Sequence, residues 1–221
     1  FNEEVYLEKS VNRLLKIKIY DSIILIDNNS SDQSLEIAKN LAQKNKNIDF
    51  YQTDETQGKG VALNFSQNLI TTTHVVIHDA DLEYFPEDII EMFSLSEKFP
   101  DSMILGSRFI GSKDRKNVYK RTYIANKFMS FFFSIVNFYY VSDVATCYKL
   151  MPTNFFRNIY IKEQGFSIEI ELLSKFLKYN QSIKELPIKY SGRSYKEGKK
   201  VKFIDGFKFL FNTLKYRFTN Y

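Results

Sequence analysis

The sequence predicts an α/β fold in which a mainly parallel sheet is flanked by helices. Short apolar runs with the length of buried strands alternate with amphipathic helical stretches through the first half of the 221 residues. Polar clusters follow several of these runs, as is typical of the carboxyl ends of parallel strands. The apolar and charged fractions, 44% and 26%, are those of a globular protein, and the length suits a single domain.

The elements of the first half follow from periodicity and from the residues at their ends. The run Ile23-Ile24-Leu25-Ile26 is typical of a buried parallel strand. Ser30 precedes Gln33 by three positions, a capping-box spacing that predicts a helix start. Pro86 suits the first turn of another helix. We expect helices over 4–17, after Ser30, over 58–70 and from Pro86 onward, and strands over 22–27, 48–51, 74–78 and 103–105.

The second half is richer in aromatic residues and less regular. Residues 119–140 and 167–179 predict helices, and residues 186–190 alternate like a strand. The tail from 203 to 218 has Phe and Leu at helical spacing among basic residues, which predicts an amphipathic helix. The opening Phe1-Asn2-Glu3-Glu4 has no strand before it, so we expect the first strand of the sheet to be missing from this sequence.

Several classes of function are disfavoured by the residues present. Two histidines and one cysteine make a zinc site a poor expectation, and Cys147 has no base near it in sequence. Gly58-Lys59-Gly60 lacks the spacing of an ATPase P-loop. The net charge of +5 comes without a recognition motif, so we expect no nucleic-acid partner. The longest apolar run, 128–141, is shorter than the roughly 20 residues of a spanning helix.

A pair of carboxylates marks the end of the strand predicted at 74–78. Asp79 and Asp81 are separated by one small residue, and two carboxylates this close repel each other unless a cation lies between them. Oxygen ligands suit Mg²⁺ or Mn²⁺, and Glu83 offers a third oxygen. We therefore expect a metal on Asp79, Asp81 and Glu83 that neutralises a diphosphate leaving group.

Three further places offer groups for an anion. Backbone N–H groups at the glycine-flanked helix start around Lys59 can approach an anion, although a helix-starting turn explains the glycines equally well. Arg108, on a Gly-Ser-Arg turn after a strand, has a fork suited to a phosphate. Arg193, Lys199 and Lys200 lie in a glycine-bearing loop that we expect to close over a diphosphate.

In their order and spacing these motifs resemble the inverting family 2 glycosyltransferases of GT-A fold, above all the dolichyl-phosphate mannosyltransferases and polyprenyl-phosphate sugar transferases. The likeness spans nearly the whole chain. The segments that show this resemblance are Phe1-Asn2-Glu3-Glu4, residues 26–32, Gly58-Lys59-Gly60-Val61-Ala62, Asp79-Ala80-Asp81-Leu82-Glu83, Gly106-Ser107-Arg108-Phe109, and the segments 143–149, 165–171 and 193–200. Asn28 and Asn29 depart from the family's Asp-Gly, which puts the base preference in doubt.

The resemblance implies one glycosyltransferase domain over 1–221, with a nucleotide-sugar-binding half at 1–111 and an acceptor-binding half at 112–221. It implies direct displacement with inversion, with Asp81, Arg108 and Glu169 as catalytic residues. The residues implied to bind the nucleotide sugar are Asn2, Glu3, Glu4, Asp27, Asn29, Lys59, Asp79, Arg193 and Lys199.

The acceptor stays open between two chemistries. A polyprenyl phosphate is already largely ionised at neutral pH, since its second pKa is about 6, and Arg108 would hold it. A glycan hydroxyl would instead need a base, and Glu169 or Glu171 is the candidate. Two readings of another class are a sugar-1-phosphate nucleotidyltransferase and a non-catalytic nucleotide-sugar binder.

The aromatic stretch and the tail helix also predict contact with a membrane surface. An apolar stripe beside Lys and Arg is typical of helices that lie among lipid headgroups, and core packing or a contact between copies in a homo-oligomer explains it equally well. We expect peripheral attachment at the cytoplasmic face of a membrane, with a nucleotide diphosphate sugar and a lipid phosphate as partners.

Overall fold

A computed structural model describes residues 1–221 except 55–57, 117–118, 180–181, 194–202 and 220–221, and gives backbone alone for 203–205. The helices are α1 (Leu7–Ile17), α2 (Ser34–Lys44), α3 (Lys59–Ser66), α4 (Asp88–Lys98), α5 (Lys120–Asn137), α6 (Thr153–Arg157), α7 (Ile168–Lys178) and α8 (Phe203–Phe218). The strands are β1 (Ile23–Asp27), β2 (Ile48–Gln52), β3 (His74–Val76), β4 (Met103–Ser107), β5 (Arg115–Lys116), β6 (Lys149–Pro152), β7 (Ile183–Pro187) and β8 (Tyr190–Ser191).

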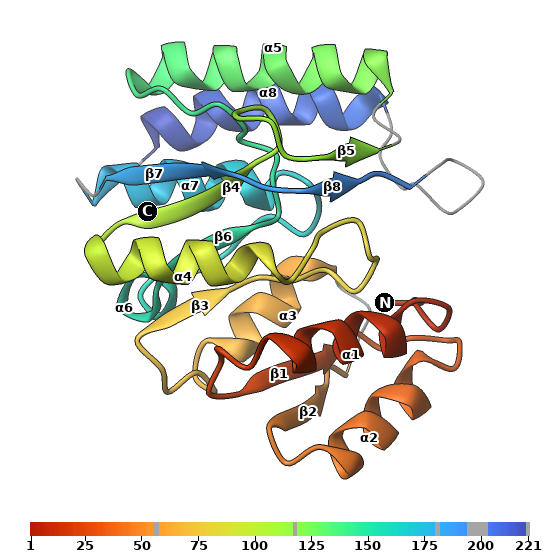
Figure 1. The fold of residues 1–221 in the computed structure, drawn as a ribbon. Coiled ribbons are helices and arrows are strands. Elements are labelled where there is room, and N and C mark those ends of the chain that lie inside the picture. Colours follow the sequence, from red (N-terminus) through yellow and green to blue (C-terminus); the bar gives the residue numbers. More distant parts are fainter. Residues whose placement is uncertain (55–57, 117–118, 180–181, 194–202, 220–221) are drawn as a thin grey trace.

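The strands form two main sheets. β1 and β2 pair in parallel, and a second sheet has the order β3-β6-β4-β7 (Figure 1). In the second sheet β4 and β7 are parallel, whereas β6 runs antiparallel to both of its neighbours, β3 and β4. A short parallel pair, β5 and β8, completes the described ladders. The expected α/β class with a mainly parallel sheet flanked by helices is confirmed, with one antiparallel strand that the sequence pattern did not indicate.

Each of the two main sheets packs against its own apolar core. The larger surrounds β4, whose five residues are all buried, and includes the fully buried side chains of Met103, Phe156 and Phe176. The smaller packs α1 and α2 against β1 and β2 through Leu7, Val11, Ala38, Leu41 and Ile48. Burial of β4 on both faces explains why its sequence is continuously apolar and does not alternate.

Two local expectations were wrong. Ser30 does not cap α2, because its hydroxyl donates to Asp27 Oδ1 at 2.5 Å; Asp32 Oδ1 instead accepts from the N–H of Ser34 at 2.9 Å. The predicted strand at 186–190 is two strands, β7 ending at Pro187 and β8 starting at Tyr190. Pro187 has no N–H to continue a ladder, so the pairing changes there.

The helices expected over 119–140 and 203–218 are confirmed as α5 and α8, and these two helices pack side by side. α5 and α8 lie together at the end of the molecule that is farthest from β1 and β2 (Figure 1). α8 also packs on α7, which lies against the larger sheet. Among the described residues no helix combines the length and apolarity needed to cross a membrane.

Candidate active site

A cavity of about 820 Å³ opens where β1 and β3 end. Of the residues implied by sequence, the structure gathers most around this cavity: Glu3, Asp27, Lys59, Asp79, Asp81, Glu83, Arg108, Glu169 and Arg193. Polar side chains from both halves of the chain therefore meet at the carboxyl edge of the sheets, as an α/β fold requires of a ligand site. Lys199 lies outside the described residues.

The loop after β1 is tied to the first residues of the chain. Asp27 is 5% exposed and accepts the N–H of Ser30 at 2.9 Å and its hydroxyl at 2.5 Å. Asn2 N–H donates to Ser30 Oγ at 3.0 Å, and Glu4 accepts the N–H of Gln33 at 2.9 Å. Asn2 and Glu4 thus hold the loop and do not line the cavity, and the nucleotide contact implied for them stays a prediction.

Asn29, the other residue implied to bind the nucleotide, is exposed and does not line the cavity. Its φ of 55° lies in the left-handed region, which asparagine tolerates better than most residues. The neighbouring Asn28 is buried and accepts the hydroxyl of Thr53 at 2.8 Å. The two asparagines therefore shape the turn that presents Asp27.

Asp79, after β3, faces a lysine from the start of α3. Lys59 Nζ lies 2.9 Å from Asp79 Oδ1 and 3.4 Å from Glu169 Oε1. Burial raises the pKa of Asp79, but the Lys59 ammonium outweighs burial and leaves that pKa below its ordinary value. Burial lowers the pKa of Lys59, but Asp79, Cys147 and Glu169 together raise it well above its ordinary value. Both groups are therefore charged at neutral pH.

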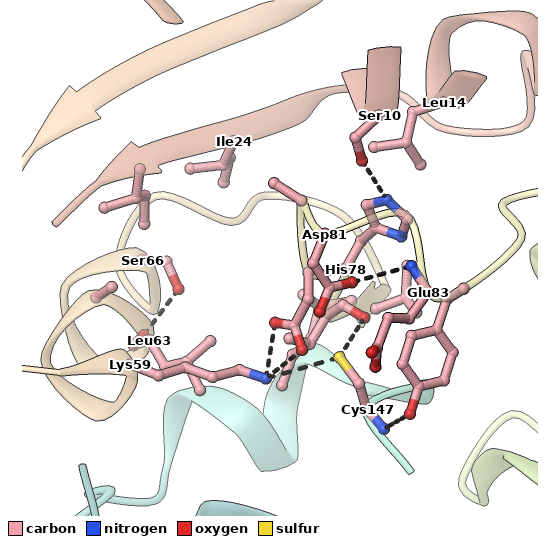
Figure 2. Close-up of a pocket in the computed structure, with 18 of the residues that line it drawn as sticks. Ser10, Leu14, Ile24, Lys59, Leu63, Ser66, His78, Asp81, Glu83 and Cys147 are labelled. Atoms are coloured by element: carbon pink, nitrogen blue, oxygen red, sulfur yellow. Dashed lines mark hydrogen bonds and ion pairs between the residues drawn. The ribbon is translucent and has the colours of Figure 1, made fainter. Parts of the chain in front are cut away.

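Asp81 and Glu83 turn toward Arg193, more than a hundred residues later in the chain. Arg193 Nη2 donates to Asp81 Oδ2 at 3.1 Å, and Nη1 lies 3.1 Å from Glu3 Oε2. Glu83 accepts the N–H of Arg193 and the hydroxyl of Tyr190, each at 2.7 Å. Figure 2 shows Asp81 accepting the backbone N–H of Glu83 within this loop.

Glu83, expected as a third metal ligand, accepts the hydroxyl of Tyr190 and the N–H of Arg193 with its two oxygens, and its role toward a metal stays a prediction. Within the described part of the chain, no group of three acidic, histidine or cysteine side chains has the arrangement of a metal cluster. Asp79 and Asp81 face different cations, which keeps the two like charges apart.

The loop that contains Asp81 is electrostatically and conformationally strained. Burial, followed by the charges of Asp79 and Glu83, raises the pKa of Asp81 to about 7. Leu82, which follows it, has a φ of 62°, an unusual value for a residue with a branched side chain. Such strain persists only where the surroundings hold it, and it is common at functional sites.

Two N–H groups at the start of α3 are already occupied by Gln164. The N–H groups of Lys59 and Val61 donate to Gln164, to its carbonyl at 3.1 Å and to its side chain at 3.0 Å. A Cβ on Gly60 would lie 2.0 Å from the carbonyl oxygen of Glu163. The glycines therefore serve a close approach between α3 and residues 163–164, and Lys59 contributes only its side chain to the site.

Arg108 forms a bidentate ion pair with Asp143. Arg108 Nε lies 2.8 Å from Asp143 Oδ2, Nη2 lies 2.8 Å from Oδ1, and the backbone N–H of Arg108 also donates to Oδ2 at 2.9 Å. Asp143 is fully buried and Arg108 is 8% exposed. The guanidinium lies 5.0 Å from the ring centroid of Tyr190. Arg108 lines the cavity as expected, but most of its hydrogen-bonding capacity is directed at Asp143.

Glu169 lies between two lysines, and one of them was not anticipated. Its Oε1 faces Lys59 and its Oε2 contacts Lys149, a fully buried side chain of β6 that also donates to the carbonyl of Thr146. Lys149 lies in a strand with apolar residues, and a lysine in that setting is the feature of the sequence that could have indicated its role. Glu171, the other candidate base, is fully buried and accepts the N–H groups of residues 162 and 163, so its role is structural.

His78 is held neutral beside the acidic loop. Its Nε2 pairs with Ser10 Oγ at 3.0 Å (Figure 2), and its Nδ1 pairs with the Tyr148 hydroxyl at 2.9 Å. Burial lowers the pKa of His78 to about 4. The described contacts tie α1 to Tyr148, which immediately precedes β6, through this ring, and no bond from His78 to Asp79 is among them.

The fold and this site define the class of the protein as a glycosyltransferase of GT-A fold. The chain belongs to glycosyl transferase family 2, whose sequence profile matches residues 1–160. It is 25% identical to an uncharacterised protein of Methanocaldococcus jannaschii, over 97% of this chain and 88% of that protein. It is also 25% identical to the UDP-N-acetylglucosamine–dolichyl-phosphate N-acetylglucosaminyltransferase of Methanococcus voltae, over 97% of this chain and 92% of the relative.

A likeness to solved structures supports the fold. Glucosyl-3-phosphoglycerate synthase from Mycobacterium tuberculosis, crystallised with Mn²⁺, UDP-glucose and phosphoglyceric acid, superposes with a TM-score of 0.72 at 14% identity. The match covers 98% of this chain and 77% of that structure. The same enzyme with UDP gives a TM-score of 0.70.

Proposed function

We propose that the protein moves a sugar from a nucleotide diphosphate sugar to a polyprenyl phosphate, with inversion and with a divalent cation. The observation that carries the choice of acceptor is the environment of Glu169, whose carboxylate is shared by Lys59 and Lys149. Each of the two oxygens of this carboxylate already faces an ammonium group. A hydroxyl acceptor needs a base, whereas a phosphate is already ionised and needs only to be positioned.

The other carboxylates on the acceptor side support the same choice. Asp143 is paired with Arg108, and Glu171 accepts backbone N–H groups and faces Lys175. The name of the Methanococcus voltae relative, a sugar transferase for dolichyl phosphate, agrees with a lipid phosphate acceptor. The Mycobacterium tuberculosis enzyme, by contrast, is named for a phosphoglycerate product, and its acceptor is a phosphate-bearing molecule of a different kind.

The charges at the site fit a divalent cation. Among the described residues, Lys59 and Lys149 face Asp79 and Glu169, whereas Arg193 faces three carboxylates, those of Glu3, Asp81 and Glu83. Burial, followed by the charges of Asp79 and Glu83, raises the pKa of Asp81, and a bound Mg²⁺ or Mn²⁺ would offset those charges. The structural neighbour was crystallised with Mn²⁺.

In this proposal Asp79 and Asp81 would hold the cation, which supplies charge neutralisation for the departing diphosphate. Lys59 and Arg193 already face these carboxylates, and they can turn their positive charges toward the donor's phosphates. The buried Nε of Arg193 has no hydrogen-bond partner in the described structure, so this guanidinium has a donor to spare for a ligand. Asp27, at the end of β1, is placed for the nucleoside.

The test of the function is a transfer assay that crosses UDP- and GDP-sugars with three acceptors: a polyprenyl phosphate, the matching polyprenol and 3-phosphoglycerate. Each combination of donor and acceptor is assayed with Mn²⁺, with Mg²⁺ and with a chelator. We expect product with the polyprenyl phosphate and a divalent cation only. Product on the polyprenol or on 3-phosphoglycerate at equal or greater rate would refute the acceptor, and product in chelator would refute the cation.

Glu169→Gln separates the two acceptor chemistries. With a phosphate acceptor we expect about a tenfold loss of kcat/KM, because the lysine contacts are disturbed but no proton has to be removed. A general base would show a loss on the order of 10³-fold or more. Because the variant leaves the fully buried ammonium of Lys149 without its carboxylate, a thermal melt beside the parent protein separates loss of fold from loss of catalysis, and the assay is run well below the variant's melting temperature.

A lipid acceptor requires a surface that meets the membrane, and α5 and α8 offer one. Exposed apolar side chains recur at helical spacing on α5 and its end, at Ile124, Phe128, Phe131, Ile135 and Phe138, and on α8 at Phe207, Phe211, Leu214 and Phe218. Both stretches have basic residues, and neither has an acidic residue over 120–138 or 206–218. We propose that these two apolar stripes seat the protein peripherally on an anionic bilayer, at its cytoplasmic face.

Charge placed in the stripes should abolish this attachment. Phe131 and Phe211 are 63% and 68% exposed, so Phe131→Asp/Phe211→Asp leaves the core unchanged. Because burying one such ring is worth about 2 kcal/mol and two rings are removed, we expect partition onto phosphatidylglycerol-containing vesicles to fall on the order of a thousandfold in a flotation assay. Ile90→Asp, at a 41% exposed position of α4, is the matched control. Equal flotation of the double variant, or dimerisation without vesicle binding, contradicts the proposal.

A further inference from the structure

Lys149 is a charged residue in the interior of the larger sheet, next to the site but not in it. It lies on β6, the strand between β3 and β4, where the register places it opposite Leu105. Its side chain is fully buried and does not line the cavity. A buried ammonium group is costly unless its protons find acceptors, and an apolar residue fills a strand interior without that cost. The charge at this position therefore indicates a role beyond packing.

The ammonium group of Lys149 is held by three acceptors. A lysine has three N–H donors, and those of Lys149 go to the carbonyls of Val144 and Thr146 and to Glu169 Oε2. β6 is paired on both edges, and all four of its residues are buried. Lys149 is therefore a fixed positive charge beside Glu169.

Lys59, which faces the other oxygen of Glu169, is placed differently. Its Nζ lies 3.4 Å from Glu169 Oε1 and 2.9 Å from Asp79 Oδ1. It also donates to Cys147 Sγ at 3.6 Å (Figure 2). The side chain of Lys59 is 29% exposed and lines the cavity. One lysine is thus fixed in the interior, and the other reaches the space in which a ligand binds.

Glu169, which joins the two lysines, is only 7% exposed. If Lys59 were its one partner, a move of Lys59 toward a donor phosphate would leave a buried carboxylate without a counter-charge, which is strongly unfavourable. Lys149 contacts the second oxygen, so the carboxylate stays compensated when Lys59 turns away. The fixed lysine therefore makes the move of the exposed lysine less costly.

We propose that Lys149 is a positioning residue for the donor, which holds the charge of Glu169 so that Lys59 can bind the donor's diphosphate. The inference rests on the donor site of the proposed function and adds to it a residue outside the cavity. Glu169 then serves the donor side of the reaction, as the link between the two lysines. Without Lys149, Glu169 would retain Lys59, and donor binding would weaken.

The experiment measures the binding of UDP and of GDP in Mn²⁺ by isothermal titration calorimetry, for the unaltered protein and five variants. Lys149→Met and Lys59→Met are made singly and together. Lys149→Met/Glu169→Leu removes the fixed charge and the carboxylate, and it is made with and without Lys59→Met. Thermal melts set a common temperature at which every protein is folded. Should Lys149→Met not fold, Lys149→Gln takes its place, because it keeps a donor for the Thr146 carbonyl.

Each single variant should weaken binding of the tighter nucleotide by about tenfold, the size expected for one charge-assisted hydrogen bond. Lys149→Met and Lys59→Met together should weaken it little more than Lys59→Met alone, because Lys59 is already withheld from the nucleotide. Lys149→Met/Glu169→Leu should bind within about threefold of the unaltered protein, and in that background Lys59→Met should regain its full effect.

Unchanged binding in Lys149→Met, or single losses that multiply in the combined variant, overturns the role of Lys149, because the two lysines then act independently. Weak binding that persists in Lys149→Met/Glu169→Leu overturns it as well, since removal of the carboxylate should release Lys59. These outcomes leave the donor site standing. Binding of neither nucleotide by the unaltered protein overturns the donor site of the proposed function, and the role of Lys149 with it.

Discussion

Replacing Asp81 by asparagine should abolish sugar transfer and, at the same time, stabilise the folded protein above neutral pH. The loss of activity follows if Asp81 holds the cation that neutralises the departing diphosphate, and it should be on the order of 10³-fold in kcat/KM. The gain in stability follows from the site itself, where burial and two neighbouring carboxylates oppose the charge of Asp81.

The direction of the pH dependence follows from the pKa values. The ordinary pKa of an aspartate is 3.8, whereas in the folded protein that of Asp81 is about 7. The folded state therefore binds this proton more tightly, and the stability it contributes is fully present below pH 4 and is lost as the pH rises through 7. Asparagine removes the unfavourable charge, so its advantage should be largest at pH 8 and disappear near pH 4.

Thermal melts in chelator at pH 8 and pH 4, beside a transfer assay in Mn²⁺, measure both effects. Asp101→Asn, in an exposed turn between α4 and β4, is the control for removal of one negative charge. Retained transfer in Asp81→Asn would refute the metal assignment. A lower melting temperature at pH 8 would show that the contact with Arg193 outweighs the repulsion.

The second large effect concerns Arg108, whose removal should destabilise the fold first and affect the acceptor second. Arg108→Met leaves the fully buried carboxylate of Asp143 without its partner. Breaking a buried pair in this way costs about 3–5 kcal/mol, which lowers the melting temperature of a protein of this size by roughly 10 °C. Thermal or denaturant unfolding at neutral pH measures this loss of stability.

A double variant separates stability from acceptor binding. Arg108→Met/Asp143→Leu removes both charges, and we expect it to recover most of the lost stability. If Arg108 also holds the acceptor phosphate, the double variant keeps a raised KM for the polyprenyl phosphate with an unchanged KM for the donor. Normal acceptor kinetics in the double variant would assign Arg108 to structure alone.

Much of the site was visible in the sequence because its residues follow strands. Asp27 is the last residue of β1, Arg108 directly follows β4, and two residues separate Asp79 from the end of β3. Parallel strands bring their carboxyl ends together, so local patterns were enough to predict which carboxylates meet. The lysine and arginine side chains that pair with the carboxylates of the site come from other parts of the chain. No local sequence pattern indicates which carboxylate each of them contacts.

The sequence by itself determined the α/β class, the acidic loop after β3 and the amphipathic tail, since periodicity and strand-end residues are local signals. Only the tertiary structure decided that Glu83 anchors Arg193, that Arg108 is paired with Asp143, and that Lys149 reaches Glu169. It also decided that β1 and β3 lie in different sheets and both line the cavity. Ion pairs and strand neighbours depend on the path of the whole chain, because a charge or a backbone edge is satisfied by whichever group the fold brings within reach.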